Sequence, residues 1–221
     1  MERQLDPELS RDILKHLEEL YIDTTRHKDL HLSDLIYCLT KTYFDKHDPL
    51  PPTEKEVLLF SLGLGLQKVL TPLELRPITV DGIICSPDFM TKHGMAAELK
   101  TTRQSSRKKL PSGEYVASEY PDTWVEQMKG YCRAVGQSQY PLAVLHMMGD
   151  YSPPWPKLVS WRNRFSQEEL DTFWDYIIAR KNLYLGYVMA GMVPEPYQYC
   201  KEWECKLDCR YSLRCEVNSR K

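Results

Sequence analysis

The sequence predicts a mixed α/β domain in which helices come first, short strands follow and a cysteine-rich tail ends the chain. Apolar residues in the first 70 positions recur at helical spacing, and residues 75–101 alternate short apolar runs with tight-turn signals. Four of the seven cysteines fall in the last 22 residues. The chain has 221 residues, of which 42% are hydrophobic and 27% charged, so one elaborated globular domain or two small ones are expected.

Three helices are expected in the first third of the chain, over residues 7–21, 33–44 and 53–69. Ser33 is a good N-cap for the second helix. Thr53 and Glu56 form a capping box that opens the third helix. Gly63 and Gly65 lie inside that third helix, where each costs about 1 kcal/mol relative to alanine. We therefore expect another segment to come close to the helix at these glycines.

Strands are expected next, over residues 75–80, 83–90, 95–101, 142–147 and 158–162. Turns at residues 81–82 and 92–94 should make the first three strands an antiparallel meander. A helix over residues 122–135 precedes the last two strands. A second capping box, formed by Ser166 and Glu169, opens a long final helix before the tail.

Asp88, Glu98 and Lys100 form the sharpest group of candidate site residues. If a three-residue turn lets Thr91 pair with Met95, the register sets Asp88 opposite Glu98. Lys100 then shares a face with Glu98, because side chains alternate along a strand. Two adjacent carboxylates repel unless a cation such as Mg²⁺ or Mn²⁺ lies between them. Such an ion would polarise a phosphate and activate water. The alternative is a solvent-exposed hairpin without a common role.

Two further patterns fit a site that acts on nucleic acid. Gln127 and Tyr131 lie four apart and share one face of the predicted helix, although an ordinary amphipathic helix gives the same pattern. Residues 100–109 contain five cations and no anion, which suits a phosphate backbone, or else a solvated loop. The candidate DNA-binding residues in this stretch are Arg103, Arg107, Lys108 and Lys109. The net charge of −2 excludes a histone-like basic protein.

The cysteines indicate a metal site rather than a disulfide framework. Their number is odd, and the charged N-terminus lacks the apolar core of a signal peptide. No apolar run is long enough to span a membrane, so we expect a cytoplasmic protein. Four thiolates could hold zinc or an iron–sulfur cluster. Zinc ligands are usually paired closely in sequence, whereas Cys38 lies some 160 residues before the tail.

The order of these features resembles the RecB-type branch of the PD-(D/E)xK nucleases, over residues 32–215. That order is a cysteine in an N-terminal helix, Asp, Glu-x-Lys, Gln-x-x-x-Tyr and three C-terminal cysteines. The chain is most similar to the CRISPR-associated RecB-like exonucleases, the fourth Cas protein family, whose cysteine helix resembles the segment Leu-Ser-Asp-Leu-Ile-Tyr-Cys at residues 32–38. The resemblance implies a restriction-endonuclease-like α/β core at 71–165. A helical part at 1–70 and a C-terminal helix with an iron–sulfur cysteine tail at 166–221 would complete one integrated domain.

The resemblance also implies an activity, namely metal-dependent exonuclease action on DNA, 5′ to 3′ on single strands. The setting would be CRISPR spacer acquisition, with DNA and CRISPR integration proteins as partners. A DNA-repair nuclease of the same superfamily and a non-catalytic DNA-binding subunit with this fold stay open. An electron carrier is the third class, but carriers usually hold their clusters in compact cysteine runs.

Particular roles follow from the same resemblance. Asp88 and Glu98 would bind Mn²⁺ or Mg²⁺ together with the Leu99 carbonyl, and Lys100 would be the catalytic lysine. Gln127 and Tyr131 would orient the site or the nucleic acid. A cluster, expected to be 4Fe-4S, would use Cys38, Cys205, Cys209 and Cys215, with Cys200 as the alternative to Cys205. Cys85 and Cys132 are expected in the core.

The sequence departs from the family pattern at two places. The family usually has a Gly-x-x-x-His helix that supplies a histidine ligand, but here the matching segment begins at Gly63 and ends at Gln67. The third metal ligand is therefore open. The usual tail is Cys-x2-Cys-x5-Cys, and Cys209 and Cys215 fit its second half. The preceding cysteine is Cys205 or Cys200, of which Cys205 keeps the tail more compact.

Overall fold

The computed structural model of the protein describes residues 7–21, 29–72, 75–148, 155–195, 205 and 209–219. Its central strands are β3 (Phe89–Met90), β4 (Ala96–Thr102), β7 (Gln139–His146) and β8 (Lys157–Arg164). Within the described residues they form one sheet in the order β3-β4-β7-β8. The inner strands β4 and β7 run parallel, and both outer pairs are antiparallel. The molecule is therefore a mixed α/β protein.

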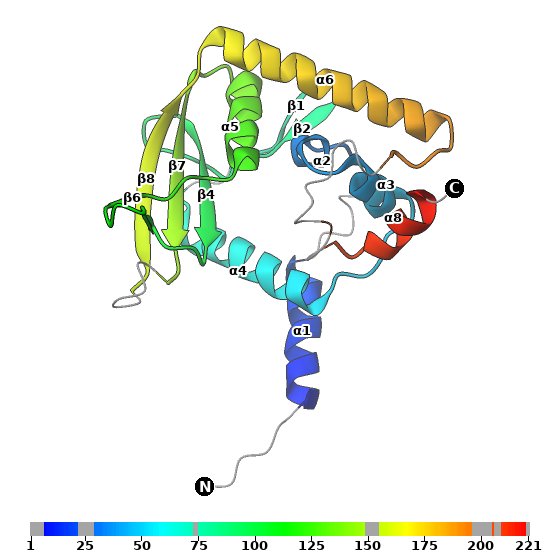
Figure 1. Cartoon of the computed structure of the whole chain (residues 1–221), viewed down its shortest axis with the longest axis horizontal. Helices are drawn as coiled ribbons and strands as arrows, with labels where there is room; N and C mark the ends of the chain where they lie inside the picture. Colours follow the sequence, from blue (N-terminus) through cyan, green and yellow to red (C-terminus); the bar gives the residue numbers. More distant parts are fainter. Residues whose placement is uncertain are drawn as a thin grey trace, which may run out of the picture.

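Helices surround this sheet. Their bounds are α1 (Pro7–Tyr21), α2 (Leu32–Ile36), α3 (Leu39–His47), α4 (Glu54–Leu70), α5 (Asp122–Val135), α6 (Gln167–Met189) and α8 (Ser212–Ser219). In Figure 1, α5 stands beside the sheet, α6 runs along the top and α4 along the bottom. The core is continuous from β7 through α5 to α2 and α6, through Leu142, Met128, Leu35 and Ile177 among others. No described helix is long and apolar enough to cross a membrane.

The predicted meander is divided into two separate hairpins, which corrects the sequence expectation. β1 (Ile78–Val80) and β2 (Ile83–Cys85) form a two-stranded sheet of their own, joined by a turn at Asp81 and Gly82, and Ile84 of β2 also makes an isolated parallel bridge to His31. Both turn residues have positive φ, 50° and 69°, as a tight hairpin turn of this kind requires. The expected strand over 83–90 is interrupted at Pro87, which has no N–H for a sheet ladder. Pairing resumes only at Phe89.

The predicted second helix is also divided, into α2 and α3, with Cys38 at the break as the N-cap of α3. The helix begins one residue before Ser33, and its N-cap is His31. Arg180 of α6 is 3% exposed and reaches the break from inside the protein. Its guanidinium donates to the carbonyls of Leu35 and Tyr37. These bonds satisfy buried carbonyls that a continuous helix would have bonded internally, so the break is stabilised by a residue distant in sequence.

The two predicted capping boxes are confirmed. The backbone N–H of Thr53 donates to Glu56 Oε2 at 2.8 Å, and Glu56 N–H donates to Thr53 Oγ1 at 3.3 Å. Ser166 N–H donates to Glu169 Oε2 at 2.8 Å in the same way. These bonds satisfy N–H groups in the first turns of α4 and α6 that have no partner inside the helix.

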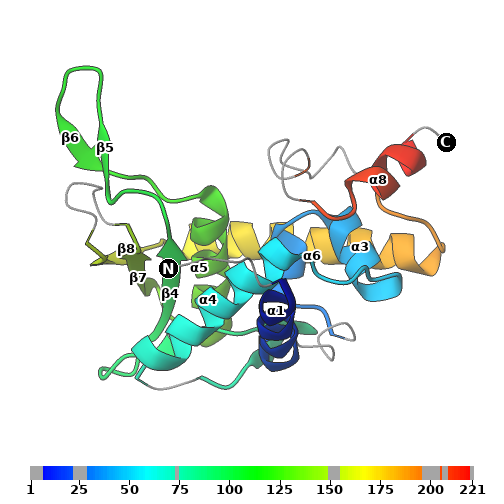
Figure 2. The same ribbon diagram turned by 90° about the horizontal axis from the view of Figure 1, so that it is seen from below.

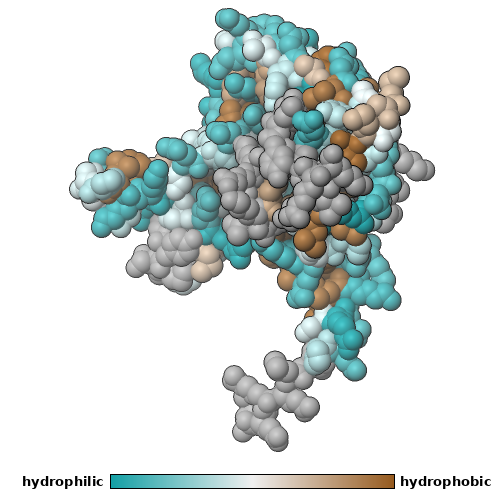
Figure 3. Space-filling view, turned by 45° about the vertical axis from the view of Figure 1, so that its right-hand side comes forward, coloured by the Kyte–Doolittle hydropathy of each residue, from teal (hydrophilic) through white to brown (hydrophobic). Residues whose placement is uncertain are grey.

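The basic stretch, for which the sequence predicted no strand, contains a two-stranded ribbon. β5 (Arg107–Lys109) pairs antiparallel with β6 (Tyr115–Ala117). Figure 2 shows this ribbon standing clear of the central sheet, beyond the end of β4. In the space-filling view the projecting arm is hydrophilic over most of its surface (Figure 3). The cations of β5 are therefore presented on a structured arm.

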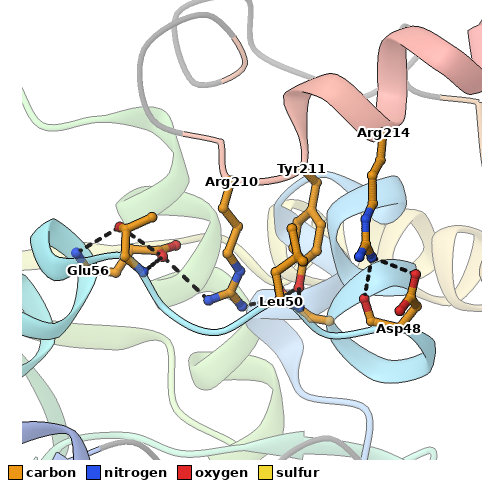
Figure 4. A network of polar contacts seen from close by, with 8 residues as sticks. Asp48, Leu50, Glu56, Arg210, Tyr211 and Arg214 are labelled. Carbon is orange, nitrogen blue, oxygen red and sulfur yellow. Dashed lines mark hydrogen bonds and ion pairs between the residues drawn. The ribbon is translucent and has the colours of Figure 1, made fainter. Parts of the chain in front are cut away.

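The C-terminal tail is fastened to α3 and the segment after it (Figure 4). Arg210 binds Asp45, and it also contacts Glu56 at 3.4 Å. Arg214 binds Asp48 at 2.6 Å. Tyr211 is fully buried, stacks on Phe44 with ring centres 5.3 Å apart and donates its hydroxyl to Asp45 at 2.7 Å. The chain end thus lies against the helix whose N-cap is Cys38.

The close approach expected at Gly63 occurs instead at Gly130. A Cβ atom at Gly63 would meet nothing within 4 Å, whereas one at Gly130 of α5 would lie 2.4 Å from Leu32 Cδ2. Gly63→Ala should therefore raise the free energy of unfolding by about 0.5–1 kcal/mol. Gly130→Ala should lower it by about 1–3 kcal/mol, because Leu32 is buried and must move.

Urea denaturation of the two variants tests this contrast. Leu32→Ala in the Gly130→Ala background is the matched control, because it opens space beneath the new methyl group and should show a favourable coupling energy. Stabilisation by Gly130→Ala equal to that by Gly63→Ala would contradict the close packing of α2 on α5.

Candidate active site

The β3–β4 hairpin brings Asp88 and Glu98 together. Thr91 N–H donates to the Met95 carbonyl at 2.8 Å, which is the turn pairing that the sequence predicts. The register pairs Phe89 with Ala97, so Asp88 follows opposite Glu98. Asp88 Oδ2 also accepts a hydrogen bond of 2.8 Å from the Leu99 N–H. The Asp88 carboxylate is therefore held against the edge of β4.

Glu98 is the buried centre of the site. Glu98 is only 1% exposed, and its Oε1 accepts a hydrogen bond of 2.6 Å from Lys100 Nζ. The second oxygen, Oε2, is buried and has no hydrogen-bond partner among the described residues. Burial raises the pKa of Glu98 to about 7, with Lys100 opposing the shift and Asp88 adding to it. A buried oxygen without a donor is the kind of atom that a cation can bind.

Lys100 joins the carboxylate to helix α5. Its Nζ also donates to Gln127 Oε1 at 2.7 Å, and Gln127 Nε2 donates to the Tyr131 hydroxyl at 2.8 Å. Burial disfavours the charged amine, but Glu98 and Asp88 outweigh this and raise the pKa of Lys100. Burial and then Glu98 raise the pKa of Tyr131 well above its ordinary value, so its hydroxyl stays protonated. The four side chains form one hydrogen-bonded chain.

Gln67 reaches the same site from α4. Its side-chain amide is close enough to the Asp88 carboxylate to interact with it as a donor, and this interaction lowers the pKa of Asp88. The larger effect on Asp88 is burial, which raises the pKa, while Lys100 and the Leu99 N–H also lower it. Because the interaction favours the charged carboxylate, the Gln67 amide is the donor. Gln67 therefore lies beside the proposed ligand Asp88, where the family pattern has a histidine.

The Leu99 carbonyl faces the same edge as Asp88. In an extended strand the N–H and C=O of one residue point to the same side, and the Leu99 N–H points to Asp88. The register places Pro87 opposite Leu99, since Phe89 pairs with Ala97. Because proline has no N–H, Pro87 cannot donate the strand-to-strand hydrogen bond that the Leu99 carbonyl would otherwise accept. An oxygen is thus turned toward the Asp88 carboxylate.

The donor set suits a hard divalent cation. Asp88, Glu98 and the Leu99 carbonyl offer only oxygen, the ligand atom that Mg²⁺ and Mn²⁺ prefer. Among the parts of the chain that the structure describes, no three His, Cys, Asp or Glu side chains are grouped as a metal site. An ion here would therefore be held by two carboxylates and completed by the carbonyl, the Gln67 amide or water.

The four candidate DNA-binding cations lie away from this buried group. Arg107, Lys108 and Lys109 form the exposed strand β5 of the projecting ribbon. Arg103 is exposed in the segment between β4 and that ribbon. The structure thus separates a buried acidic centre from an exposed basic arm on the continuation of the same strand.

Three of the candidate cluster cysteines gather where the tail meets α3. Cys38 is buried, and Cys209 and Cys215 are half-buried. Burial raises the pKa of Cys215 to about 12, with the sulfurs of Cys209 and Cys38 adding to the shift. Burial likewise raises the pKa of Cys209, and Cys38 contributes again. The three sulfurs are therefore coupled electrostatically, but within the described residues they are not grouped closely enough to form a metal site.

The fourth cluster cysteine is not placed among these thiols. Cys205 is disulfide-bonded, and a sulfur in a disulfide cannot ligate iron until the disulfide is reduced. Cys200 lies outside the described residues. Cys85 and Cys132 are fully buried in the core, as the sequence predicts, and burial raises the pKa of each to about 12.

Sequence reasoning missed Tyr140, which belongs to the surroundings of the site. It is fully buried on β7, its ring centre lies 6.0 Å from that of Tyr131 with the rings tilted by 37°, and its hydroxyl has no hydrogen-bond partner among the described residues. Burial, followed by Glu98, raises its pKa well above the ordinary value. The alternation of buried residues along β7 is the signal that could have found it.

Comparisons with known proteins support the fold and leave the family open. No protein-family model matches the sequence, and no curated protein sequence matches it either. The structure is similar to a crystal structure of the protein SSO0001, with a TM-score of 0.56 and 18% identity over 95% of this chain and 97% of that one. A weaker similarity, with a TM-score of 0.44 and 10% identity, is to an alkaline exonuclease (LHK-Exo) from Laribacter hongkongensis, over 78% of this chain and 95% of that one. The similarity to SSO0001 spans nearly the whole of both chains and concerns the fold alone.

Glu98 should make the stability of the metal-free protein depend on pH. The folded protein holds the Glu98 proton up to about pH 7, whereas the unfolded chain releases it near the ordinary value of 4.5. The folded state therefore binds more protons between these values, and its contribution to the free energy of unfolding falls as the pH rises, by at most about 1.4 kcal/mol per unit. Glu98→Gln keeps an acceptor for Lys100 and should show a flatter profile.

Urea denaturation in a chelator, between about pH 5 and 8, measures both profiles. Added Mg²⁺ should reduce the slope of the parent protein and leave that of Glu98→Gln unchanged. Superimposable slopes for parent and variant would show that Glu98 does not titrate in this interval.

Gln67 should affect metal binding more than stability. Gln67→Ala removes the amide interaction with Asp88 and should weaken Mn²⁺ binding, with a change in unfolding free energy of about 1 kcal/mol or less. Gln67→His restores the residue type of the family pattern and should keep or strengthen the binding. Calorimetric Mn²⁺ titrations of the three proteins provide the measurement, and identical titrations of parent and Gln67→Ala would place Gln67 outside the site.

Proposed function

We propose that this chain is a metal-dependent deoxyribonuclease of the PD-(D/E)xK type. The observation that carries the proposal is the buried carboxylate Glu98, which has one oxygen on Lys100 and one oxygen without a donor beside Asp88. The Leu99 carbonyl completes a set of oxygen ligands at the end of a short hairpin. The match between this geometry and the order of motifs in the sequence supports the assignment.

Each side chain has a defined task in such a site. A bound Mg²⁺ or Mn²⁺ would polarise the scissile phosphate and lower the pKa of an attacking water. Lys100 is a cation held by Glu98 and Gln127, so its ammonium group can donate to a phosphoryl oxygen as negative charge develops there. Gln127 and Tyr131 fix the position of that lysine through their hydrogen-bonded chain. Asp88 is fixed by the Leu99 N–H and by Gln67.

The finer parts of the proposal concern substrate and setting. We assign exonuclease activity on single-stranded DNA with 5′ to 3′ polarity, in CRISPR spacer acquisition together with CRISPR integration proteins. The order of sequence motifs supports this choice over a repair nuclease of the same superfamily. DNA labelled at either end shows the polarity directly, because a 5′ exonuclease releases a 5′ label in the first products.

Single substitutions in the site should abolish cleavage while the protein stays folded. Asp88→Asn and Glu98→Gln remove charge that binds the ion, and Lys100→Met removes the ammonium group at nearly the same length. We expect a loss of at least about a hundredfold in the cleavage rate of end-labelled single-stranded DNA with Mn²⁺. Lys92→Met, on the exposed turn of the same hairpin, is the control and should cut normally.

The parent protein should also lose activity in a chelator and regain it with excess Mn²⁺ or Mg²⁺. Cleavage retained in Asp88→Asn would refute the proposed site. Tight DNA binding by a parent protein that cuts neither single nor double strands would instead identify a non-catalytic subunit with this fold.

The second part of the proposal is an iron–sulfur cluster, expected to be 4Fe-4S, at the contact between the tail and α3. The order of cysteines in the sequence supports it, and so does the electrostatic coupling of Cys215 to Cys209 and Cys38 where the tail meets α3. Metal binding would bring the thiolates together and release their protons. The fourth ligand would be Cys205, once its disulfide is reduced, or Cys200. The same donor set could hold zinc.

Protein purified without oxygen should contain iron and acid-labile sulfide. Cys38→Ala, Cys209→Ala and Cys215→Ala should each lower the iron content and the thermal stability. Cys132→Ala is the control, because its thiol is buried in the core away from the tail. Loss of iron in Cys200→Ala but not in Cys205→Ala would assign Cys200 as the fourth ligand. Stoichiometric zinc without iron after anaerobic reconstitution would contradict the cluster.

A further inference from the structure

The ribbon formed by β5 and β6 is held firmly at its base. The segment that leaves β4 is bound by the buried His146, whose Nδ1 lies 2.9 Å from the Gln104 carbonyl. Ser118 closes the other side, where its N–H donates to the Ser106 carbonyl at 3.1 Å and its hydroxyl to the Ser105 carbonyl at 2.8 Å. A two-stranded ribbon is marginally stable alone, so these contacts fix the arm relative to the strand that carries Glu98.

One face of the ribbon combines an aromatic ring with two cations. The register pairs Arg107 with Ala117 and Lys109 with Tyr115, so Arg107, Lys109 and Tyr115 share a face. The Arg107 guanidinium lies 5.1 Å from the centre of the Tyr115 ring, and Lys109 Nζ lies 5.8 Å from it. Tyr115 is 57% exposed. Lys108 pairs with Val116 and therefore points to the opposite face.

The charge of the ribbon contrasts with that of the rest of the chain. Residues 103–117 contain four cations and one anion, a net charge of +3, whereas the whole chain has a net charge of −2. Arg107 and Lys109 are separated by two residues of a strand, about 7 Å, which lets them reach different phosphates of one extended strand. A polyanion is therefore the ligand whose charge complements this arm.

We propose that Tyr115 is a stacking surface for an unpaired base, and that Arg107 and Lys109 bind the flanking phosphates of a single DNA strand. An exposed aromatic ring between cations is the combination that binds single-stranded nucleic acid without reading its sequence. The bases of a duplex are stacked on one another, so their faces are not available to the ring. The choice of single-stranded DNA as the ligand rests on the proposed function, and the ribbon adds the side chains that would bind the strand outside the active site.

Fluorescence anisotropy in a chelator tests this proposal without cleavage. The probes are a labelled oligothymidylate of about 15 nucleotides and a duplex of the same length. Tyr115→Ala should raise the Kd for the single strand about tenfold, whereas Tyr115→Phe, which keeps the ring, should stay within about twofold of the parent. The Kd for the duplex should change by about twofold or less.

Lys108 and Lys109 provide a matched pair of neighbouring cations on opposite faces. Lys109→Ala should weaken single-strand binding and reduce the slope of log Kd against log salt by about 0.7. Lys108→Ala should have clearly smaller effects on both the affinity and the slope. Tyr115→Ala should leave that slope unchanged, because the ring carries no charge. Circular dichroism should be the same for all variants, since the three side chains are exposed.

Three results would overturn the proposal: equal single-strand affinity for Tyr115→Ala and parent, equal losses on single strand and duplex, or equal effects of Lys108→Ala and Lys109→Ala. Cleavage assays with Mn²⁺ separate this failure from that of the proposed function. A parent protein that cuts DNA while Tyr115→Ala binds normally refutes the ribbon site alone. If Tyr115→Ala weakens single-strand binding as expected but the parent protein cuts no DNA, the ribbon site is supported and the nuclease assignment is refuted.

Discussion

The burial of Glu98 is the constraint around which the site is arranged. A carboxylate with 1% exposure is costly unless other groups replace the water that it loses. Lys100 supplies one strong bond at 2.6 Å, yet Oε2 lacks a partner among the described residues. A fold selected only for stability would place an apolar residue at such a position. The incomplete satisfaction of this group is therefore best understood as the cost of a site that binds a cation.

The surrounding elements are positioned by the same group. β4 carries Glu98 and Lys100, its parallel partner β7 buries Tyr140 behind them, and α5 delivers Gln127 to the lysine. α4 reaches the other carboxylate through Gln67. The close contact of Gly130 with Leu32 brings α5 against α2, which ends just before Cys38. The helix that carries Gln127 and Tyr131 and the helix that precedes Cys38 thus belong to one connected core.

Local patterns in the sequence predicted much of this arrangement. The turn after Thr91, the capping boxes at Thr53 and Ser166 and the i, i+4 pair Gln127 and Tyr131 all depend on residues close in the chain. The turn placed Asp88 opposite Glu98, whereas the hydrogen bond between Lys100 and Gln127 joins two different elements and was not predicted. The predictions were wrong where a distant residue decides the outcome. Arg180 stabilises the break at Cys38 from 145 residues beyond Leu35, and nothing near Ser33 indicates this.

Glycine and proline positions also show that local sequence patterns do not reveal which residue a long-range contact requires. Gly63 and Gly130 are both helical glycines, and only the packing of α2 on α5 reveals which of them is required. Pro87 was visible in the sequence, but it was interpreted as part of a motif rather than as the end of a strand pairing. Its missing N–H both separates the two hairpins and leaves the Leu99 carbonyl without a ladder donor from the opposite residue. One residue thus ends a strand and helps to build the site.

The fastening of the tail suggests that a cluster would rigidify this contact rather than create it. Tyr211 is fully buried against Phe44, and Arg210 and Arg214 pair with acidic residues of the segment from α3 to α4. These contacts involve no sulfur, and the ion pairs are half-exposed, so each is individually weak. The buried ring supplies most of the apolar contact. A tail docked in this way brings Cys209 and Cys215 toward Cys38 before any metal binds, which lowers the conformational entropy that metal binding must overcome. Loss of the metal would then loosen the tail without unfolding the core that holds Glu98.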